Sequence, residues 1–170
     1  MFLYFNTIFG RIDIILNEIH KSIEIPKQSE RLIFEIEDTL KKNELNYSDV
    51  IFSTISGPGN FTNIKTNLAV AKAIKLATKN NLIVSNLFEI IGFDEDYDYL
   101  TIKINPQKYY IKDKNDNYSI AENIDNLQGK ILSEFSDKKW KQITKYKFEN
   151  RIFNEFEPMY VESASISIRK

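Results

Sequence analysis

The residues best placed to do chemistry form a glycine-rich loop between an apolar run and a helix-forming segment. They are Gly57, Pro58, Gly59, Asn60, Phe61 and Thr62. The β-branched run at 50–55 predicts a strand before the loop, and the alanine-rich run after it predicts a helix at 61–78. Because the free amides and the positive dipole end of a helix N-terminus attract anions, the loop is a candidate phosphate contact.

The same loop also has a purely structural interpretation. Gly57 and Gly59 permit backbone angles or close approaches that a Cβ would block, and Pro58 stiffens the chain between them. Asn60 or Thr62 can cap the following helix by accepting hydrogen bonds from its first amides. The loop lacks the Gly-Lys-Ser/Thr ending of a P-loop and the third glycine of the dinucleotide fingerprint. An ordinary strand-to-helix turn is therefore the alternative.

No group of residues suited to acid–base or nucleophilic catalysis is evident in the sequence. The chain has no cysteine, which excludes thiolate metal sites and cysteine nucleophiles. Its one histidine, His20, is expected on the surface or in packing. The acidic run at 94–98 has Tyr99 where a calcium loop needs glycine and Asn105 where it needs glutamate, so we expect a linker there. We predict neither catalytic residues nor a metal site.

The spacing of apolar residues and of turn residues predicts an N-terminal α/β lobe at 1–93. Strands are expected at 3–5, 12–16, 22–25, 50–55 and 82–84, and helices at 28–42, 61–78 and 87–91. The first three strands should form an antiparallel meander, because only short turns separate them.

Residues 94–170 are predicted to form a smaller C-terminal α/β lobe. Strands are expected at 100–104, 108–112, 118–121 and 130–135, with a helical turn at 124–127 and strand-like alternation at 159–168. Trp140, the one tryptophan of the sequence, is expected to anchor packing.

The helix expected at 28–42 has an apolar face that should pack in the core, and one aromatic residue lies outside this face. The apolar stripe consists of Leu32, Ile33, Ile36 and Leu40. Phe34 lies outside this stripe among charged residues that include Glu30. It is therefore either an isolated exposed aromatic or a contact for another protein.

The helix expected at 61–78 is apolar over most of its circumference. Its lysines form a narrow stripe that is either solvated or in contact with phosphate, and they are Lys65, Lys72 and Lys75. So wide an apolar arc predicts burial on two sides, against the sheet and against something else, unless this is simply the central helix of a small protein. The predicted partner interface comprises Glu30, Phe34, Ile64, Leu68, Ala69 and Ala73.

Composition limits the classes of function. With 170 residues, the chain can hold one sizeable core or two small lobes. Its 42% hydrophobic and 28% charged content is that of a soluble globular protein, and no apolar run approaches the roughly 20 residues that span a bilayer. A formal charge of −1 argues against a protein that binds nucleic acid unaided. We infer a cytoplasmic protein without membrane contact.

The glycine loop resembles the Gly-Pro-Gly-Ser-Phe-Thr-Gly-Leu-Arg signature of the TsaB (YeaZ-like) family. The matching residues are Gly57, Pro58, Gly59, Phe61 and Thr62, whereas Asn60, Asn63, Ile64 and Lys65 differ. The segment at 68–73 is similar to the Leu-Ala-Thr-Ala-Lys-Gly that follows the signature. Weaker similarities occur at 28–30, 105–110 and 158–161. The chain looks like a divergent and shortened member of this family.

The resemblance implies an actin-like or ribonuclease-H-like α/β fold of two small lobes, with mixed sheets flanked by helices. It also implies a non-catalytic subunit that pairs helix to helix with TsaD and, through it, recruits the ATPase TsaE. That complex transfers a threonylcarbamoyl group to the adenosine next to the anticodon of tRNA. This subunit alone would bind no cofactor and would contact tRNA only indirectly, although a nucleotide at the partner interface is left open.

Two alternatives to this function stay open. The first is a small actin-fold ATPase or phosphotransferase that uses the loop at 57–62 for phosphate. Such enzymes use a carboxylate after the first strand, where this chain has Asn6 and Thr7, and the sequence shows no second phosphate loop. The second is a homodimeric binding module, because a surface that accepts a homologous partner can also accept its own copy.

Overall fold

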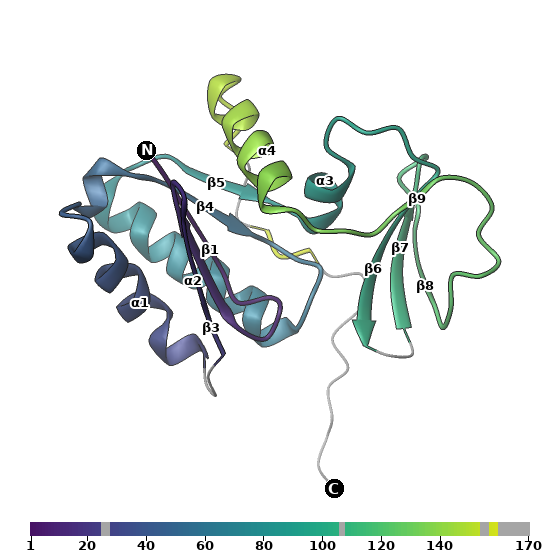
Figure 1. The fold of residues 1–170 in the computed structure, drawn as a ribbon, viewed down its shortest axis with the longest axis horizontal. Coiled ribbons are helices and arrows are strands. Elements are labelled where there is room, and N and C mark those ends of the chain that lie inside the picture. Colours follow the sequence, from purple (N-terminus) through teal and green to yellow (C-terminus); the bar gives the residue numbers. More distant parts are fainter. Residues whose placement is uncertain (25–27, 106–107, 154–156, 160–170) are drawn as a thin grey trace, which may run out of the picture.

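The computed structural model describes residues 1–24, 28–105, 108–153 and 157–159. Two β-sheets, of five and four strands, lie at opposite ends of the molecule (Figure 1). Helices flank the larger sheet on both sides, and a short helix lies between the sheets. This arrangement agrees with the predicted α/β class with mixed sheets.

The larger sheet has the strand order β3-β2-β1-β4-β5. Its strands are β1 (Phe2–Asn6), β2 (Ile12–Leu16), β3 (Ile19–Ile23), β4 (Ile51–Ile55) and β5 (Leu82–Ser85). β1, β2 and β3 form the predicted antiparallel meander, whereas β4 is parallel to both β1 and β5.

The smaller sheet has the order β8-β7-β6-β9. It comprises β6 (Tyr99–Asn105), β7 (Lys108–Asp113), β8 (Tyr118–Ala121) and β9 (Ile131–Leu132). β6 and β7 pair antiparallel, as do β7 and β8, whereas β9 joins β6 in parallel.

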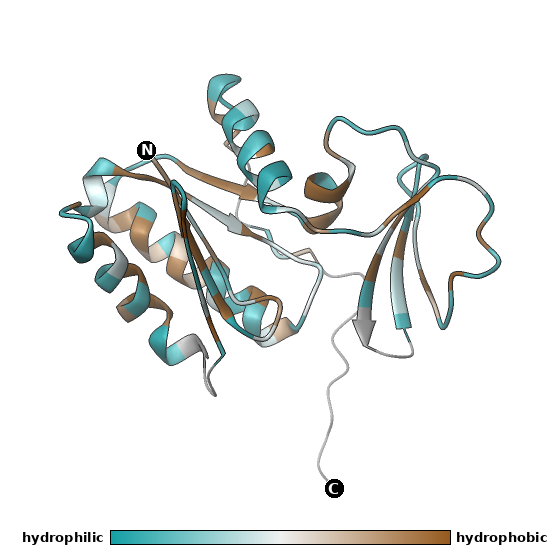
Figure 2. Cartoon of the chain, viewed as in Figure 1, coloured by the Kyte–Doolittle hydropathy of each residue, from teal (hydrophilic) through white to brown (hydrophobic). Residues whose placement is uncertain are grey.

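Helices α1 (Gln28–Lys42) and α2 (Phe61–Thr78) cover one face of the larger sheet, and α4 (Asp137–Glu149) covers the other (Figure 1). A short 3-10 helix, η1 (Tyr47–Asp49), precedes β4. The short helix α3 (Leu87–Gly92) follows β5 and is mostly hydrophobic (Figure 2), and its apolar side chains are buried.

Trp140 anchors α4 on the larger sheet, as a packing residue would. Its ring lies 5.1 Å from that of Tyr4, and its Nε1–H donates to Ser53 Oγ at 3.1 Å. Ser53 also hydrogen-bonds Thr144 at 3.0 Å. A helix from the region 94–170 thus packs against the N-terminal sheet, and the division of the chain at 93/94 stays a prediction.

Three of the expected elements differ in the structure. β3 begins at Ile19 instead of residue 22, because a tight turn with Asn17 at φ 53° lets Leu16 pair directly with Ile19. The segment at 124–127 forms a hydrogen-bonded turn only, and the strand expected at 130–135 is limited to Ile131–Leu132. The strand expected at 159–168 lies outside the described residues except for Met159.

Candidate functional site

Gly57 occupies a position that a side chain could not share. Its φ is +120°, and a Cβ placed there would come within 2.6 Å of the Met159 carbonyl oxygen and 2.9 Å of Ile64 Cδ1. The neighbouring segment is held in place because the Met159 amide donates to the Ser56 carbonyl at 2.9 Å. Gly57 is thus required by both its backbone angle and its surroundings.

Gly59 is required by close packing alone. A Cβ on Gly59 would lie 2.6 Å from Cγ2 of Ile8, in the turn between β1 and β2. The glycine loop therefore packs directly on that turn, which agrees with the predicted close approach.

Asn60 is the cap of α2. Its Oδ1 accepts hydrogen bonds from the amides of Thr62 at 3.0 Å and Asn63 at 3.4 Å. These are amides that an anion at the helix N-terminus would use, so the side chain of Asn60 stands where a phosphate oxygen would. The structural interpretation of the loop is therefore the better supported of the two.

The turn after β1 is held by hydrogen bonds of buried polar side chains. Asn6 Oδ1 accepts a hydrogen bond from the Ile8 amide at 3.0 Å, while Thr7 donates both its amide and its hydroxyl to Asn67 Oδ1. Asn6, Thr7 and Asn67 are all buried. Asn67 was missed, although a polar residue within the apolar arc of α2 was a usable signal.

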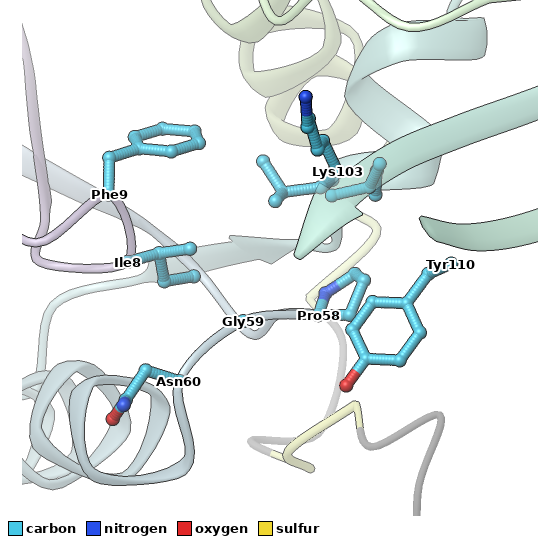
Figure 3. A pocket seen from close by; sticks show the side chains of 9 residues that line it. Ile8, Phe9, Pro58, Gly59, Asn60, Lys103 and Tyr110 are labelled. Carbon is cyan, nitrogen blue, oxygen red and sulfur yellow. The ribbon is translucent and has the colours of Figure 1, made fainter. Parts of the chain in front are cut away.

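A pocket of about 220 Å³ lies between the glycine loop and the smaller sheet (Figure 3). It is lined by Ile8, Phe9, Pro58, Gly59, Asn60, Leu87, Ile102, Lys103 and Tyr110. Most of these side chains are apolar, and the side chain of Asn60 turns toward the start of α2. No carboxylate is present among the described residues that line this pocket. The pocket can hold a small apolar group, but its lining provides no acid–base pair.

Several charged residues outside this pocket make structural contacts. His20 Nδ1 lies 3.2 Å from Asp137 Oδ2, which links β3 to the start of α4. In the acidic linker, Lys139 pairs with Glu95 at 3.0 Å, and the Lys130 amide donates to Asp98 at 2.9 Å. Within the described ranges, no three histidine, cysteine or acidic side chains gather in a way that could hold a metal ion.

A second candidate site is the outward face of α1 and α2. Phe34 is 57% exposed, as expected, and Leu76 is 81% exposed. Ile33 was expected in the core but is 47% exposed, because it lies at the edge of the stripe, beside the gap between the two helices. Glu30, Ala69 and Ala73 are exposed as well. We refer to these residues and the exposed Ala77 together as the α1–α2 face.

Two residues of the predicted interface are not part of this face. Ile64 and Leu68 are buried within the core, on the side of α2 that packs on the sheet. Their side chains cannot contact a partner, so the prediction was wrong for both. The sequence predicted that α2 has more apolar residues than the sheet can bury, and several of them are exposed. It did not indicate which of these residues would pack on the sheet.

A groove of about 260 Å³ runs between the two helices. It is lined by Ile33, Glu37, Tyr47, Val70, Ala73, Ile74, Ala77 and Thr78. The groove is largely apolar and lies beside Phe34, so the α1–α2 face offers both a projecting aromatic ring and a recess.

The remaining segments that resemble the TsaB family are only partly described. Residues 28–30 begin α1, and Tyr110 is buried beside the pocket. Residues 106–107 and 160–161 lie outside the described residues. Their contribution to a site therefore stays a prediction.

Within the part of the chain that the structure describes, no helix is both long and apolar enough to cross a membrane.

The fold has counterparts among solved structures, whereas no family model and no curated protein matches the chain. YeaZ from Pseudomonas aeruginosa superposes with a TM-score of 0.66 at 11% sequence identity, and the match covers 94% of this chain and 98% of that one. A crystal structure of an uncharacterized protein with similarity to peptidase YEAZ from Pseudomonas aeruginosa gives a TM-score of 0.66 at 11% identity, covering 95% and 99%. The chain thus has a YeaZ-like, actin-like/ribonuclease-H-like fold, as predicted.

Proposed function

We propose that this chain is a non-catalytic scaffold or activator subunit with a role like that of TsaB. It binds TsaD, and through TsaD the ATPase TsaE, for threonylcarbamoyl transfer to the adenosine next to the anticodon of tRNA. The observation that carries the proposal is the α1–α2 face, where Ile33, Phe34 and Leu76 expose large apolar side chains.

These side chains leave much of their apolar surface in contact with solvent, although the Arg31 guanidinium lies 5.6 Å from the centre of the Phe34 ring. Burying apolar surface contributes roughly 25 cal/mol per Å², so grouped exposed side chains leave free energy that association can recover. The alanines between them allow the backbone of a partner helix to approach closely. A helix-to-helix contact with a protein of related fold suits this surface.

The glycine loop supports the scaffold in this proposal and does not bind a substrate. Asn60 already caps the amides of α2, and Gly59 packs on Ile8, so the loop fixes α2 relative to β1. The alternative of a small ATPase or phosphotransferase lacks comparable support, because the pocket beside the loop is lined mainly by apolar side chains.

In the proposed complex, this chain and TsaD have different roles. TsaD would supply the transfer reaction and most of the tRNA contact, because a chain with a net charge of −1 has little attraction for phosphate. This chain would present the α1–α2 face and hold TsaD in its working arrangement in the cytoplasm. A nucleotide at their interface stays a prediction.

The proposal is tested by co-expressing the chain with TsaD from the same organism and measuring the mass of the purified species by light scattering. A one-to-one complex is expected. Separately, adding TsaD, TsaE and the enzyme that makes the adenylate should permit tRNA modification. Appreciable ATP hydrolysis by the pure chain with added metal ions would contradict the scaffold role.

A further inference from the structure

The acidic residues of this chain are unevenly distributed along the sequence. Residues 1–12, 50–88 and 99–112 contain no aspartate or glutamate, so all 24 acidic side chains lie outside these three segments. The same segments contain eight basic residues, which are Arg11, Lys65, Lys72, Lys75, Lys79, Lys103, Lys108 and Lys112. The net charge of −1 therefore combines a basic part of the chain with a strongly acidic part, and it does not describe the local surface.

The fold brings these three segments together at one end of the molecule. The turn between β1 and β2, the start of α2 and the adjacent ends of β6 and β7 lie at the same end in Figure 1. Every residue that lines the pocket of about 220 Å³ beside the glycine loop belongs to one of the three segments. Phe9 comes from the first segment, Asn60 from the second and Lys103 from the third (Figure 3). The pocket therefore lies where the basic segments meet.

Lys65 of α2 and Lys103 of β6 are both exposed, and each lies over an aromatic ring. Lys65 Nζ is 4.1 Å from the centre of the Phe61 ring, and Lys103 Nζ is 5.7 Å from the centre of the Tyr109 ring. In the part of the chain that the structure describes, neither ammonium group pairs with a carboxylate. Both charges can therefore meet an anionic partner.

Aromatic rings are exposed beside the same pocket. Phe9, in the turn between β1 and β2, and Phe61, the first residue of α2, are each 41% exposed. An exposed ring beside an ammonium group suits a nucleotide, because the ring stacks on a base while the ammonium contacts a phosphate. The pocket itself is mostly apolar and has room for one planar base.

We propose that the surface formed by Phe9, Phe61, Lys65, Lys103 and Tyr109 binds single-stranded RNA. We call this surface the pocket rim. Its lysines contact backbone phosphates, its aromatic rings stack on bases, and the pocket receives one base that has left the stack. A single strand suits the rim better than a duplex, because the base faces of a duplex are covered by their neighbours.

The inference rests on the proposed function in one respect, since the tRNA of the complex with TsaD supplies the RNA. It differs from the indirect contact that the family resemblance implies, because here the chain itself touches RNA. The pocket rim is also separate from the α1–α2 face, and the two surfaces have no residue in common. One copy of the chain can therefore bind TsaD and RNA at the same time.

The test uses the full chain alone and a fluorescein-labelled RNA with the sequence of an anticodon stem–loop. Fluorescence anisotropy at low ionic strength should show saturable binding, and a blunt RNA duplex of the same length should bind roughly fivefold more weakly or worse. The logarithm of the binding constant should fall with the logarithm of the salt concentration with a slope of about −1.4, as expected when two lysines neutralise two phosphates of a single strand. Excess AMP should leave most of the RNA bound, because a free nucleotide reaches only one part of the rim.

Variants locate the binding on the pocket rim. Lys65→Glu and Lys103→Glu should each weaken RNA binding by roughly fivefold or more, because a phosphate then meets a carboxylate. Phe61→Ala should weaken it by roughly fivefold or more through the loss of stacking. Lys145→Glu and Tyr146→Ala make comparable changes at exposed positions of α4 and are the matched controls. Both controls should bind RNA within roughly twofold of the wild type, and thermal melts confirm that each variant is folded.

Several results would overturn the proposal. They are a wild type that binds no RNA, equal binding of the duplex, displacement of the RNA by AMP, and an equal loss of affinity in Lys145→Glu and Lys103→Glu. A chain that binds TsaD but no RNA would remove this inference and leave the scaffold role intact. A chain that binds RNA through the pocket rim but never binds TsaD would support this inference and remove the scaffold role.

Discussion

Asn67 on α2 accepts two hydrogen bonds from Thr7, one from its amide and one from its hydroxyl, each at 3.0 Å. Its Nδ2 also donates to the Ile55 carbonyl at 3.3 Å. One buried side chain therefore ties α2 to the turn after β1 and to the end of β4. This contact holds α2 in register with the sheet, so it also determines which side of α2 remains for a partner.

Replacing Asn67 with Ala should lower the free energy of unfolding by roughly 2 kcal/mol, because the buried amide of Thr7 loses its acceptor and the Thr7 hydroxyl keeps only the Asn63 carbonyl, at 3.3 Å. Urea denaturation measures the loss. Lys72→Ala, on the exposed side of the same helix, is the control and should change stability by less than about 0.5 kcal/mol. Equal, small losses for both variants would show that Asn67 does not hold the helix.

Replacing Gly59 with Val should destabilise the chain more than Asn60→Ala does. The added side chain would overlap Ile8, which costs about 1–3 kcal/mol or more, whereas loss of the cap costs about 0.5–2 kcal/mol. Paired thermal melts decide the order.

The Gly59 result has a specific control in a double-mutant cycle. Because the overlap is with Ile8 Cγ2, Ile8→Ala should recover part of the loss caused by Gly59→Ala. Additive losses in the cycle would mean that Gly59 is constrained by something other than Ile8.

The smaller sheet should weaken in acid because of Asp98. The hydrogen bond from the Lys130 amide, together with the Lys114 ammonium, holds the pKa of Asp98 below its ordinary value of 3.8. A carboxyl whose pKa is lowered on folding stabilises the native state above its unfolded pKa, and this contribution is lost as pH falls through the folded pKa. Stability should thus decline below about pH 4.

Asp98→Asn isolates this effect, since an amide does not titrate. Its free energy of unfolding should vary less between about pH 5 and pH 2 than that of the wild type. Asp125→Asn, in an exposed loop, serves as the matched control and should follow the wild-type curve. An Asp98→Asn curve parallel to the wild type would rule out the contribution of Asp98.

Helices α1 and α2 could be predicted because local signals agreed. The limits of α2, Phe61–Thr78, follow from the cap at Asn60 and the alanine-rich run that lies within the helix, and α1 follows from its apolar stripe. Helix α4 had no such signal. It is mostly hydrophilic (Figure 2), and even Lys147 is buried, where it pairs with Glu89 at 2.8 Å and donates to the Val84 carbonyl at 3.0 Å.

The candidate interface could be predicted only in part, because tertiary packing decides which apolar residues the core uses. Phe34 was identified by its position outside the stripe, and its exposure agrees with that. Ile64 was predicted at the interface but is buried, and Ile33 was predicted in the core but is exposed. Each lies near the edge of the apolar face of its helix, so the position of the sheet and of the neighbouring helix decides whether it is buried.

The central claim is that the α1–α2 face binds TsaD, and Phe34→Asp tests it most directly. The melting temperature of the variant should be nearly unchanged, because Phe34 is exposed. Its affinity for TsaD, measured on the same preparation, should weaken by roughly 1–3 kcal/mol, as expected for an aromatic anchor. Tyr146→Asp, an exposed aromatic on α4, should bind TsaD like the wild type. A folded Phe34→Asp variant that binds TsaD as tightly as the wild type would contradict the claim.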